Sequence, residues 1–101
     1  MRTIVLARLD KVRPALVLTA PDRLGRLSNL TLAPITSTRR GLPTEIAVGS
    51  RNGLDHESVV SCDNITTVST DDVLSTIGVF FDDDEPALRA AIAAAFDLDV
   101  E

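Results

Sequence analysis

Apolar and polar residues alternate in short blocks over the first 80 positions of the chain, and each block is shorter than an ordinary helix. The blocks are rich in Val, Ile, Leu and Thr, which favour a pleated, half-buried surface, and turn-forming residues separate them. They predict seven strands, at positions 3–9, 15–19, 30–35, 44–48, 58–62, 65–68 and 76–80. Pro14 and Pro34 lack a backbone donor, so Pro14 should lie at a strand start or edge and Pro34 at a bulge or an edge.

The pattern changes after position 81, where an acidic run and Pro86 predict the start of a helix. Carboxylates there complement the helix dipole and satisfy free N–H groups, and Glu85 is spaced to pair with Arg89. A metal site is the less favoured interpretation, because no further hard ligands follow at loop spacing. One helical face should pack on the sheet through its apolar side chains, Leu88, Ala91, Ile92, Ala95 and Phe96.

Many short strands followed by one helix predict a mainly β (α+β) fold, in the form of a small, curled, antiparallel barrel. With 101 residues and 45% hydrophobic residues, the chain should form one globular domain over 1–101. Its apolar runs are too short to span a bilayer, and no leader sequence is evident, so we expect a cytoplasmic protein without membrane contact. The single Cys62 can form no internal disulfide, and no Cys/His cluster suggests zinc.

The charge is unevenly distributed, although the net charge of −5 by itself argues against a nucleic-acid binder. Positions 1–50 carry eight Lys or Arg residues against three acids, whereas positions 51–101 carry two arginines against twelve acids. This asymmetry is consistent with a local polyanion site on an acidic body, and equally with ordinary surface solvation.

Four ordered blocks of sequence resemble the MazF/PemK toxins. They are IVLARLD at 4–10, VRPALVL at 12–18, APITST at 33–38 with LPTE at 42–45, and GLDHESVV at 53–60 running into CDNITT at 62–67. The resemblance implies an SH3-like barrel of the MazF/CcdB type and a homodimer that needs no cofactor. It further implies the toxin of a type II toxin–antitoxin system, a metal-independent, sequence-specific endoribonuclease acting on single-stranded RNA and silenced by a small MazE-like antitoxin.

The resemblance assigns the family's catalytic arginine to Arg13 and its catalytic threonine to Thr36. Cleavage by the adjacent 2′-hydroxyl would pass through a phosphorane and leave 2′,3′-cyclic phosphate and 5′-hydroxyl ends. Arg13 offers a rigid fork of donors to two phosphate oxygens and Thr36 a neutral hydroxyl to a third. Arginine is a poor proton acceptor, and Asp63, which aligns with an acid in some relatives' active sites, could orient or deprotonate the 2′-hydroxyl.

Donors near these positions are candidate RNA contacts, namely Lys11, Ser37, Thr38, Arg39 and Arg40. Arg39 and Arg40 could equally be solvated surface charges. The lone His56 falls in a variable slot of its block, which argues against a general-base role. Cys62, inside an expected strand, reads as a small buried apolar residue rather than a nucleophile.

The chain departs from the family in two places. Only three residues separate Leu9 from Arg13, where relatives carry a longer Gly-rich loop, and no Trp or Tyr is available for base stacking. A non-cleaving relative that only binds antitoxin is therefore one alternative. A gyrase poison of the CcdB type is another, although those proteins act through C-terminal residues that include a tryptophan.

Overall fold

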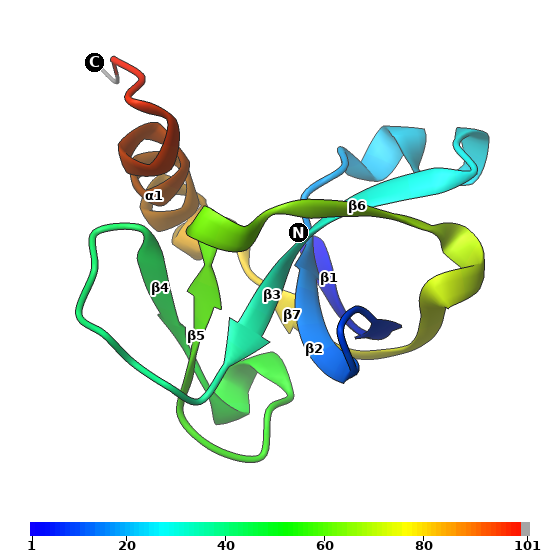
Figure 1. The fold of residues 1–101 in the computed structure, drawn as a ribbon, viewed down its shortest axis with the longest axis horizontal. Helices are drawn as coiled ribbons and strands as arrows, with labels where there is room; N and C mark the ends of the chain where they lie inside the picture. The colour runs from blue at the N-terminus through cyan, green and yellow to red at the C-terminus, as the bar shows by residue number, and fades with distance from the viewer. Residues whose placement is uncertain (100–101) are drawn as a thin grey trace.

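The computed structural model describes residues 1–99, which form seven strands and one α-helix (Figure 1). The strands and the helix are β1 (Arg2–Arg8), β2 (Val12–Val17), β3 (Asn29–Thr36), β4 (Glu45–Val48), β5 (Ser58–Ser61), β6 (Thr66–Ser69), β7 (Val73–Phe80) and α1 (Glu85–Phe96). Short 3-10 turns lie between them, namely η1 (Pro21–Arg26), η2 (Ser50–Asn52), η3 (Cys62–Asn64), η4 (Thr70–Asp72) and η5 (Asp82–Asp84). All seven predicted strands are present. The second and the last each begin three residues earlier than expected, and Cys62 opens η3 instead of ending β5.

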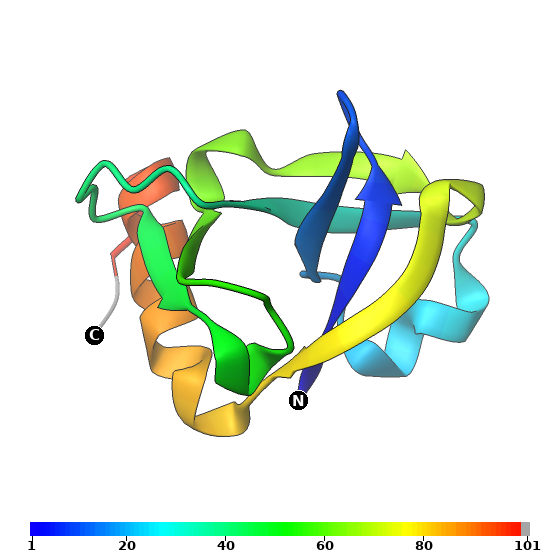
Figure 2. The same cartoon turned by 90° about the horizontal axis from the view of Figure 1, so that it is seen from below.

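The strands form one antiparallel sheet in the order β4-β5-β3-β2-β1-β7, and β6 pairs with β3 outside this path. The long β3 has two partners on the same side, because Asn29–Leu32 pair with β6 whereas Ile35 and Thr36 pair with β5. Pro34 lies in the gap between those two partners, so its missing N–H leaves no ladder bond unmade. This split curls the sheet into a half-barrel, which Figure 2 shows from below, and it confirms the fold expected from the sequence.

Two apolar clusters lie on opposite faces of the sheet, as the strand alternation requires. One contains Ile4, Leu16, Val60 and Phe80, and is closed by Leu88 of α1. The other contains the alternate positions of the same strands, among them Val5, Ala15, Val17 and Leu32. Each fully buried side chain of this size contributes roughly 1.5–3 kcal/mol of burial free energy. The two clusters together fix the register of β1, β2 and β3.

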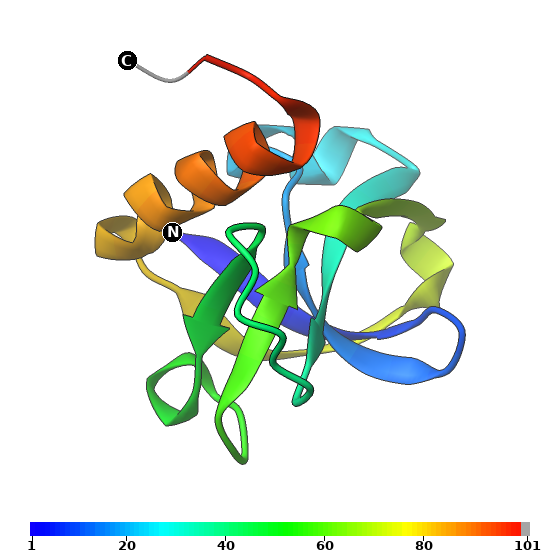
Figure 3. The same cartoon turned by 60° about the vertical axis from the view of Figure 1, so that its left-hand side comes forward.

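The helix α1 packs against β4 and η3 (Figure 3). Leu88 and Ala91 are buried, and Ile92 and Ala95 pack against the same cluster, as predicted. The expectation for Phe96 is wrong, because its side chain is 56% exposed. The chain turns at Asp97, which adopts φ 55°, so Phe96 belongs to the last turn and extends past the sheet.

The acidic run before α1 does not cap the helix as predicted. Asp84 occupies the N-cap position without a side-chain hydrogen bond. Asp82 instead forms an ion pair with the amino group of Met1 at 2.8 Å, and Asp83 pairs with Arg51 at 3.2 Å. These carboxylates therefore anchor the start of the helix to distant parts of the chain.

Glu85 also has a different partner from the one predicted. Its carboxylate accepts two hydrogen bonds from Arg2, at 2.8 and 3.1 Å, instead of pairing with Arg89. Arg2 donates a third hydrogen bond to the carbonyl of Leu18. This bidentate pair ties the first strand to the start of α1, a contact between residues 83 positions apart.

Candidate active site

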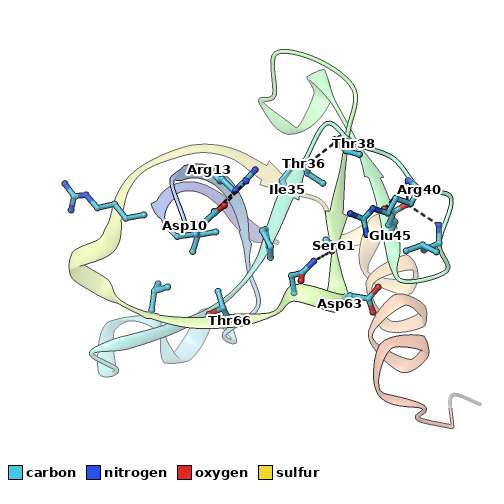
Figure 4. Close-up of a pocket in the computed structure, with 16 residues that line it drawn as sticks. Asp10, Arg13, Ile35, Thr36, Thr38, Arg40, Glu45, Ser61, Asp63 and Thr66 are labelled. Atoms are coloured by element: carbon cyan, nitrogen blue, oxygen red, sulfur yellow. Dashed lines mark hydrogen bonds and ion pairs between the residues drawn. The ribbon is translucent and has the colours of Figure 1, made fainter.

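An open cavity of about 750 Å³ lies where β2 begins and β3 ends, beside the apolar cluster that contains Val5 and Leu32 (Figure 4). It is bounded by the β1–β2 turn, by β3, by the loop 37–44 and by the segment from β5 to β6. The residues that line it are Arg8, Leu9, Asp10, Arg13, Pro34, Ile35, Thr36, Thr38, Arg40, Leu42, Glu45, Ser61, Asp63, Asn64, Thr66 and Val68. All three predicted catalytic residues are among them.

The pairing of β2 with β3 explains why Arg13 and Thr36 meet. The ladder ends at the pair Ala15 and Pro34, and Arg13 lies two residues before Ala15 while Thr36 lies two residues after Pro34. Residues two apart along a strand point to the same face of the sheet, so both side chains lie on the face of this last pair. The ladder therefore brings a guanidinium and a hydroxyl, 23 positions apart in the sequence, to the same wall of the cavity.

The guanidinium of Arg13 is held by Asp10, at the other end of the short β1–β2 turn. Its Nε donates to Oδ1 of Asp10 at 2.7 Å and its Nη2 donates to Oδ2 at 2.9 Å. The hydrogen bond holds the pKa of the Asp10 carboxyl well below its ordinary range and raises the pKa of Arg13. Arg13 thus stays protonated, and among residues 1–99 no other side-chain hydrogen bond or ion pair engages its remaining N–H donors, which can meet a ligand. Sequence reasoning did not assign Asp10 to the site, although an acid three residues before Arg13 in a tight turn was a usable signal.

Thr36 ends β3 with its side chain oriented by the following loop. Its hydroxyl oxygen accepts a hydrogen bond from the backbone N–H of Thr38 at 3.2 Å. A hydroxyl oriented in this way still has its own hydrogen available for donation. The ordinary turn-forming role of this threonine is therefore compatible with a role in the cavity.

The predicted RNA contacts divide into two groups. Thr38 and Arg40 line the cavity, whereas Lys11, Ser37 and Arg39 are exposed and do not line it. The loop that carries four of these residues is held at its far end by Glu45, whose carboxylate accepts hydrogen bonds from backbone N–H groups of the loop. Sequence reasoning missed Glu45 because its partners are main-chain groups, which leave no side-chain pattern to detect. It also missed Arg8, another cavity residue.

Asp63 lies in η3, on the side of the cavity away from Arg13 (Figure 4). Its Oδ2 accepts a hydrogen bond from the hydroxyl of Thr44 at 2.6 Å. The neighbouring Cys62 is 1% exposed, and burial, with a smaller effect of the Asp63 charge, raises the pKa of its thiol to about 11. Cys62 is thus the buried residue that the sequence predicted, and His56 is exposed and does not line the cavity.

The cavity presents more free donors to an anion than its residue list suggests. Its lining contains three arginines and three acids, but Asp10 is paired with Arg13 and the Glu45 carboxylate is directed at backbone amides. Within residues 1–99, no ion pair engages the guanidinium of Arg8 or Arg40. Such a cavity is suited to a ligand that carries phosphate groups.

No helix between residues 1 and 99 is long and apolar enough to cross a membrane. Over the same residues, no group of three or more His, Cys, Asp or Glu side chains is placed to hold a metal ion.

The curled antiparallel sheet with one C-terminal helix is the fold of the MazF toxins. The family model of the PemK-like, MazF-like toxin of type II toxin-antitoxin system matches residues 3–96. Endoribonuclease MazF3 of Mycobacterium tuberculosis is 52% identical over 99 residues, which cover 98% of this chain and 96% of the relative. The chain therefore belongs to the PemK-like, MazF-like toxin family.

Solved structures show the same likeness. The M. tuberculosis toxin MazF-mt6 matches with a TM-score of 0.96 and 50% sequence identity, over 98% of this chain and 100% of that one. A mycobacterial endoribonuclease in complex with its cognate antitoxin matches with a TM-score of 0.86 over 98% of this chain and 95% of its own. At 24% identity, this second structure supports the fold alone.

Proposed function

We propose that this toxin is an endoribonuclease that cleaves single-stranded RNA at specific sequences without a metal ion. Membership of the MazF-like family supports the nuclease activity. The observation that carries the mechanism is the convergence of the Arg13 guanidinium and the Thr36 hydroxyl on one cavity. Both groups are donors, and neither depends on a bound ion to act on a phosphate.

The proposed step is attack of a ribose 2′-oxygen on the adjacent phosphorus. A P–O bond to the 2′-oxygen forms, the P–O5′ bond breaks, and the departing 5′-oxygen takes a proton from water, so the products are a 2′,3′-cyclic phosphate and a 5′-hydroxyl. Arg13 donates to the non-bridging oxygens while negative charge builds on them, and Thr36 donates to a third oxygen. Each preorganised donor of this kind lowers a barrier by roughly 2.7–4 kcal/mol.

Arg13 cannot take the proton of the 2′-hydroxyl, because the hydrogen bond from Arg13 to Asp10 raises the pKa of Arg13 and keeps it protonated. A separate acceptor is therefore required. We assign this role to Asp63, which lines the side of the cavity away from Arg13 and would act on the 2′-hydroxyl from that side of the bound RNA. Among residues 1–99, its carboxylate accepts a side-chain hydrogen bond through Oδ2 alone. The other oxygen is available to orient or deprotonate the 2′-hydroxyl. Undiminished cleavage by the Asp63→Asn variant would remove Asp63 from the mechanism.

The proposal includes the partners and the location that such a toxin requires. A small MazE-like antitoxin with an acidic, flexible segment would compete with RNA for the donors of the cavity. A homodimer would extend one cavity into a groove long enough for several nucleotides. Cellular RNA is met in the cytoplasm, which is the location that we propose.

The decisive experiment compares Arg13→Ala with Arg23→Ala, since Arg23 is an exposed arginine of η1 that does not line the cavity. We expect purified wild-type protein and Arg23→Ala to cut a long transcript in EDTA, leaving cyclic-phosphate ends, and Arg13→Ala to lose at least about a hundredfold in rate. Equal cleavage by the wild type and Arg13→Ala would contradict the mechanism. No cleavage by wild type, with inhibition of gyrase instead, would support the gyrase-poison alternative.

A further inference from the structure

The carboxylate of Glu45 lies where the loop 37–44 returns to the sheet. Its Oε1 accepts hydrogen bonds from the backbone N–H groups of Arg40 at 3.1 Å and Leu42 at 3.2 Å. Its Oε2 is 3.3 Å from the Arg40 nitrogen. The N–H of Glu45 itself donates to the carbonyl of Leu42 at 3.1 Å. One residue therefore binds the loop through both its side chain and its backbone.

The conformation of Gly41 makes this arrangement possible. Gly41 has φ +69°, the left-handed region that glycine adopts without strain, and it separates the two residues whose N–H groups meet the carboxylate. A left-handed residue within a turn directs neighbouring N–H groups toward one side, which creates a small anion-binding concavity. Here the chain's own Glu45 occupies that concavity. Hydrogen bonds from N–H groups to an ionised acceptor are among the stronger ones in proteins.

The loop held in this way forms part of the cavity lining. Thr38 and Arg40 line it from the loop, and Glu45 lies at its rim (Figure 4). A loop of eight residues without such an anchor would lose conformational entropy when it ordered around a ligand. A carboxylate beside a phosphate-binding cavity would also repel the ligand, unless its charge were engaged elsewhere. The backbone amides engage it.

We propose that Glu45 is a positioning residue of the active site, which preorders the loop 37–44 so that Thr38 and Arg40 meet the RNA. It acts through the loop and touches no reacting atom, so its loss should weaken substrate binding more than the chemical step. The proposal rests on the RNA cleavage proposed above. It adds that recognition of the RNA nucleotides beside the scissile phosphate depends on the carboxylate of Glu45.

The test compares Glu45→Gln with Glu57→Gln. Glutamine has nearly the same shape as glutamate, but it presents an NH₂ group to amides that need an acceptor. Glu57 is an exposed acid before β5 that does not line the cavity, and no hydrogen bond or ion pair to it is found among residues 1–99. Steady-state kinetics on a short RNA, amide hydrogen exchange of Arg40 and Leu42, and thermal unfolding are measured for both variants and for wild type.

We expect Glu45→Gln to raise KM about tenfold, which corresponds to about 1.4 kcal/mol, and to change kcat by less than about twofold. The amides of Arg40 and Leu42 should exchange at least about tenfold faster, while the midpoint of unfolding stays near that of wild type. Glu57→Gln should match wild type in every measurement. Glu45→Asp keeps the charge on a shorter stem and should restore part of both the exchange protection and the KM.

Three results would overturn the proposal. An unchanged KM despite faster exchange would show that loop order does not govern binding. A fall in kcat at constant KM would place Glu45 in the chemistry, and a lower KM would mean that the carboxylate competes with the phosphate. If Glu45→Gln fails to fold, the same criteria are applied to Glu45→Asp. If wild type cleaves no RNA, the proposed function fails, whereas the exchange of Arg40 and Leu42 still tests the anchoring of the loop.

Discussion

The hydroxyl of Thr36 offers the sharpest test of the site, because it can be removed almost without a change of shape. Valine replaces the hydroxyl by a methyl group and suits the end of a strand as well as threonine does. The substitution removes the acceptor for the N–H of Thr38, a 3.2 Å bond at the exposed edge of the loop. The cost to folding should not exceed about 1 kcal/mol, the usual net value of one hydrogen bond.

The effect on catalysis should be much larger than the effect on stability. If Thr36 donates to a phosphate oxygen in the transition state, its loss should reduce kcat about 10²- to 10³-fold, as for other oxyanion donors. Thr36→Ser keeps the hydroxyl and should remain within about tenfold of wild type. The contrast between the two variants separates the hydroxyl from the packing of the methyl group.

The assay is single-turnover cleavage of a short RNA labelled at both ends, with the products separated to identify the 2′,3′-cyclic phosphate. Urea unfolding of both variants confirms that any loss of rate is not a loss of fold. The reasoning is refuted if Thr36→Val cleaves within about tenfold of wild type. It is also refuted if Thr36→Ser is as slow as Thr36→Val.

Three further predictions concern the scaffold. At Gly78 an added Cβ would lie 1.7 Å from a backbone carbonyl of η2. Gly78→Ala should therefore lower the free energy of unfolding, measured in urea, by about 2 kcal/mol or more. At Gly25 an added Cβ meets nothing within 4 Å, so Gly25→Ala should be near neutral. Iodoacetamide at pH 8 should leave Cys62 unmodified in native protein and alkylate it in urea, because the pKa of the buried thiol is raised to about 11; rapid alkylation of native protein would contradict this. The pKa of Asp10 is lower in the folded protein than its ordinary value of 3.8, so its pair with Arg13 stabilises the fold fully above pH 3.8. This stabilisation is lost as the pH falls from 3.8 toward the pKa of the folded state. Wild type should therefore melt at a higher temperature than Asp10→Asn at neutral pH, and this difference should disappear in acid. A difference in melting temperature that grew in acid would contradict the prediction.

The sequence alone determined the elements of the fold. Each strand can be recognised from a few consecutive residues, because the strand backbone directs successive side chains to alternate faces. Pro34 shows how local this information is, because it was expected at a bulge or an edge and lies in the gap between two partners of β3. Pro14, expected at a strand start or edge, is instead the third residue of β2, opposite Leu6 of β1. The burial of Leu88 and of Cys62 followed from the same kind of pattern.

The positions of Arg13 and Thr36 followed from the resemblance to a family, and the strand pairing supplies the physical reason for their proximity. What the sequence could not supply was the set of partners that each charged side chain selects. The local rule of spacing paired Glu85 with Arg89, but in the fold Glu85 forms its ion pair with Arg2. A long side chain on a helix can reach several partners, and only the packing of strand against helix decides among them.

The same limit applies inside the cavity. That Glu45 holds backbone amides of a loop depends on the path of that loop and on a left-handed Gly41, neither of which is encoded in a side-chain pattern. Local sequence thus determined which segments become strands and helix, since covalent spacing fixes their periodicity. The tertiary structure alone decided which charges are paired and which donors remain free, because these depend on distances between segments that are remote in the chain.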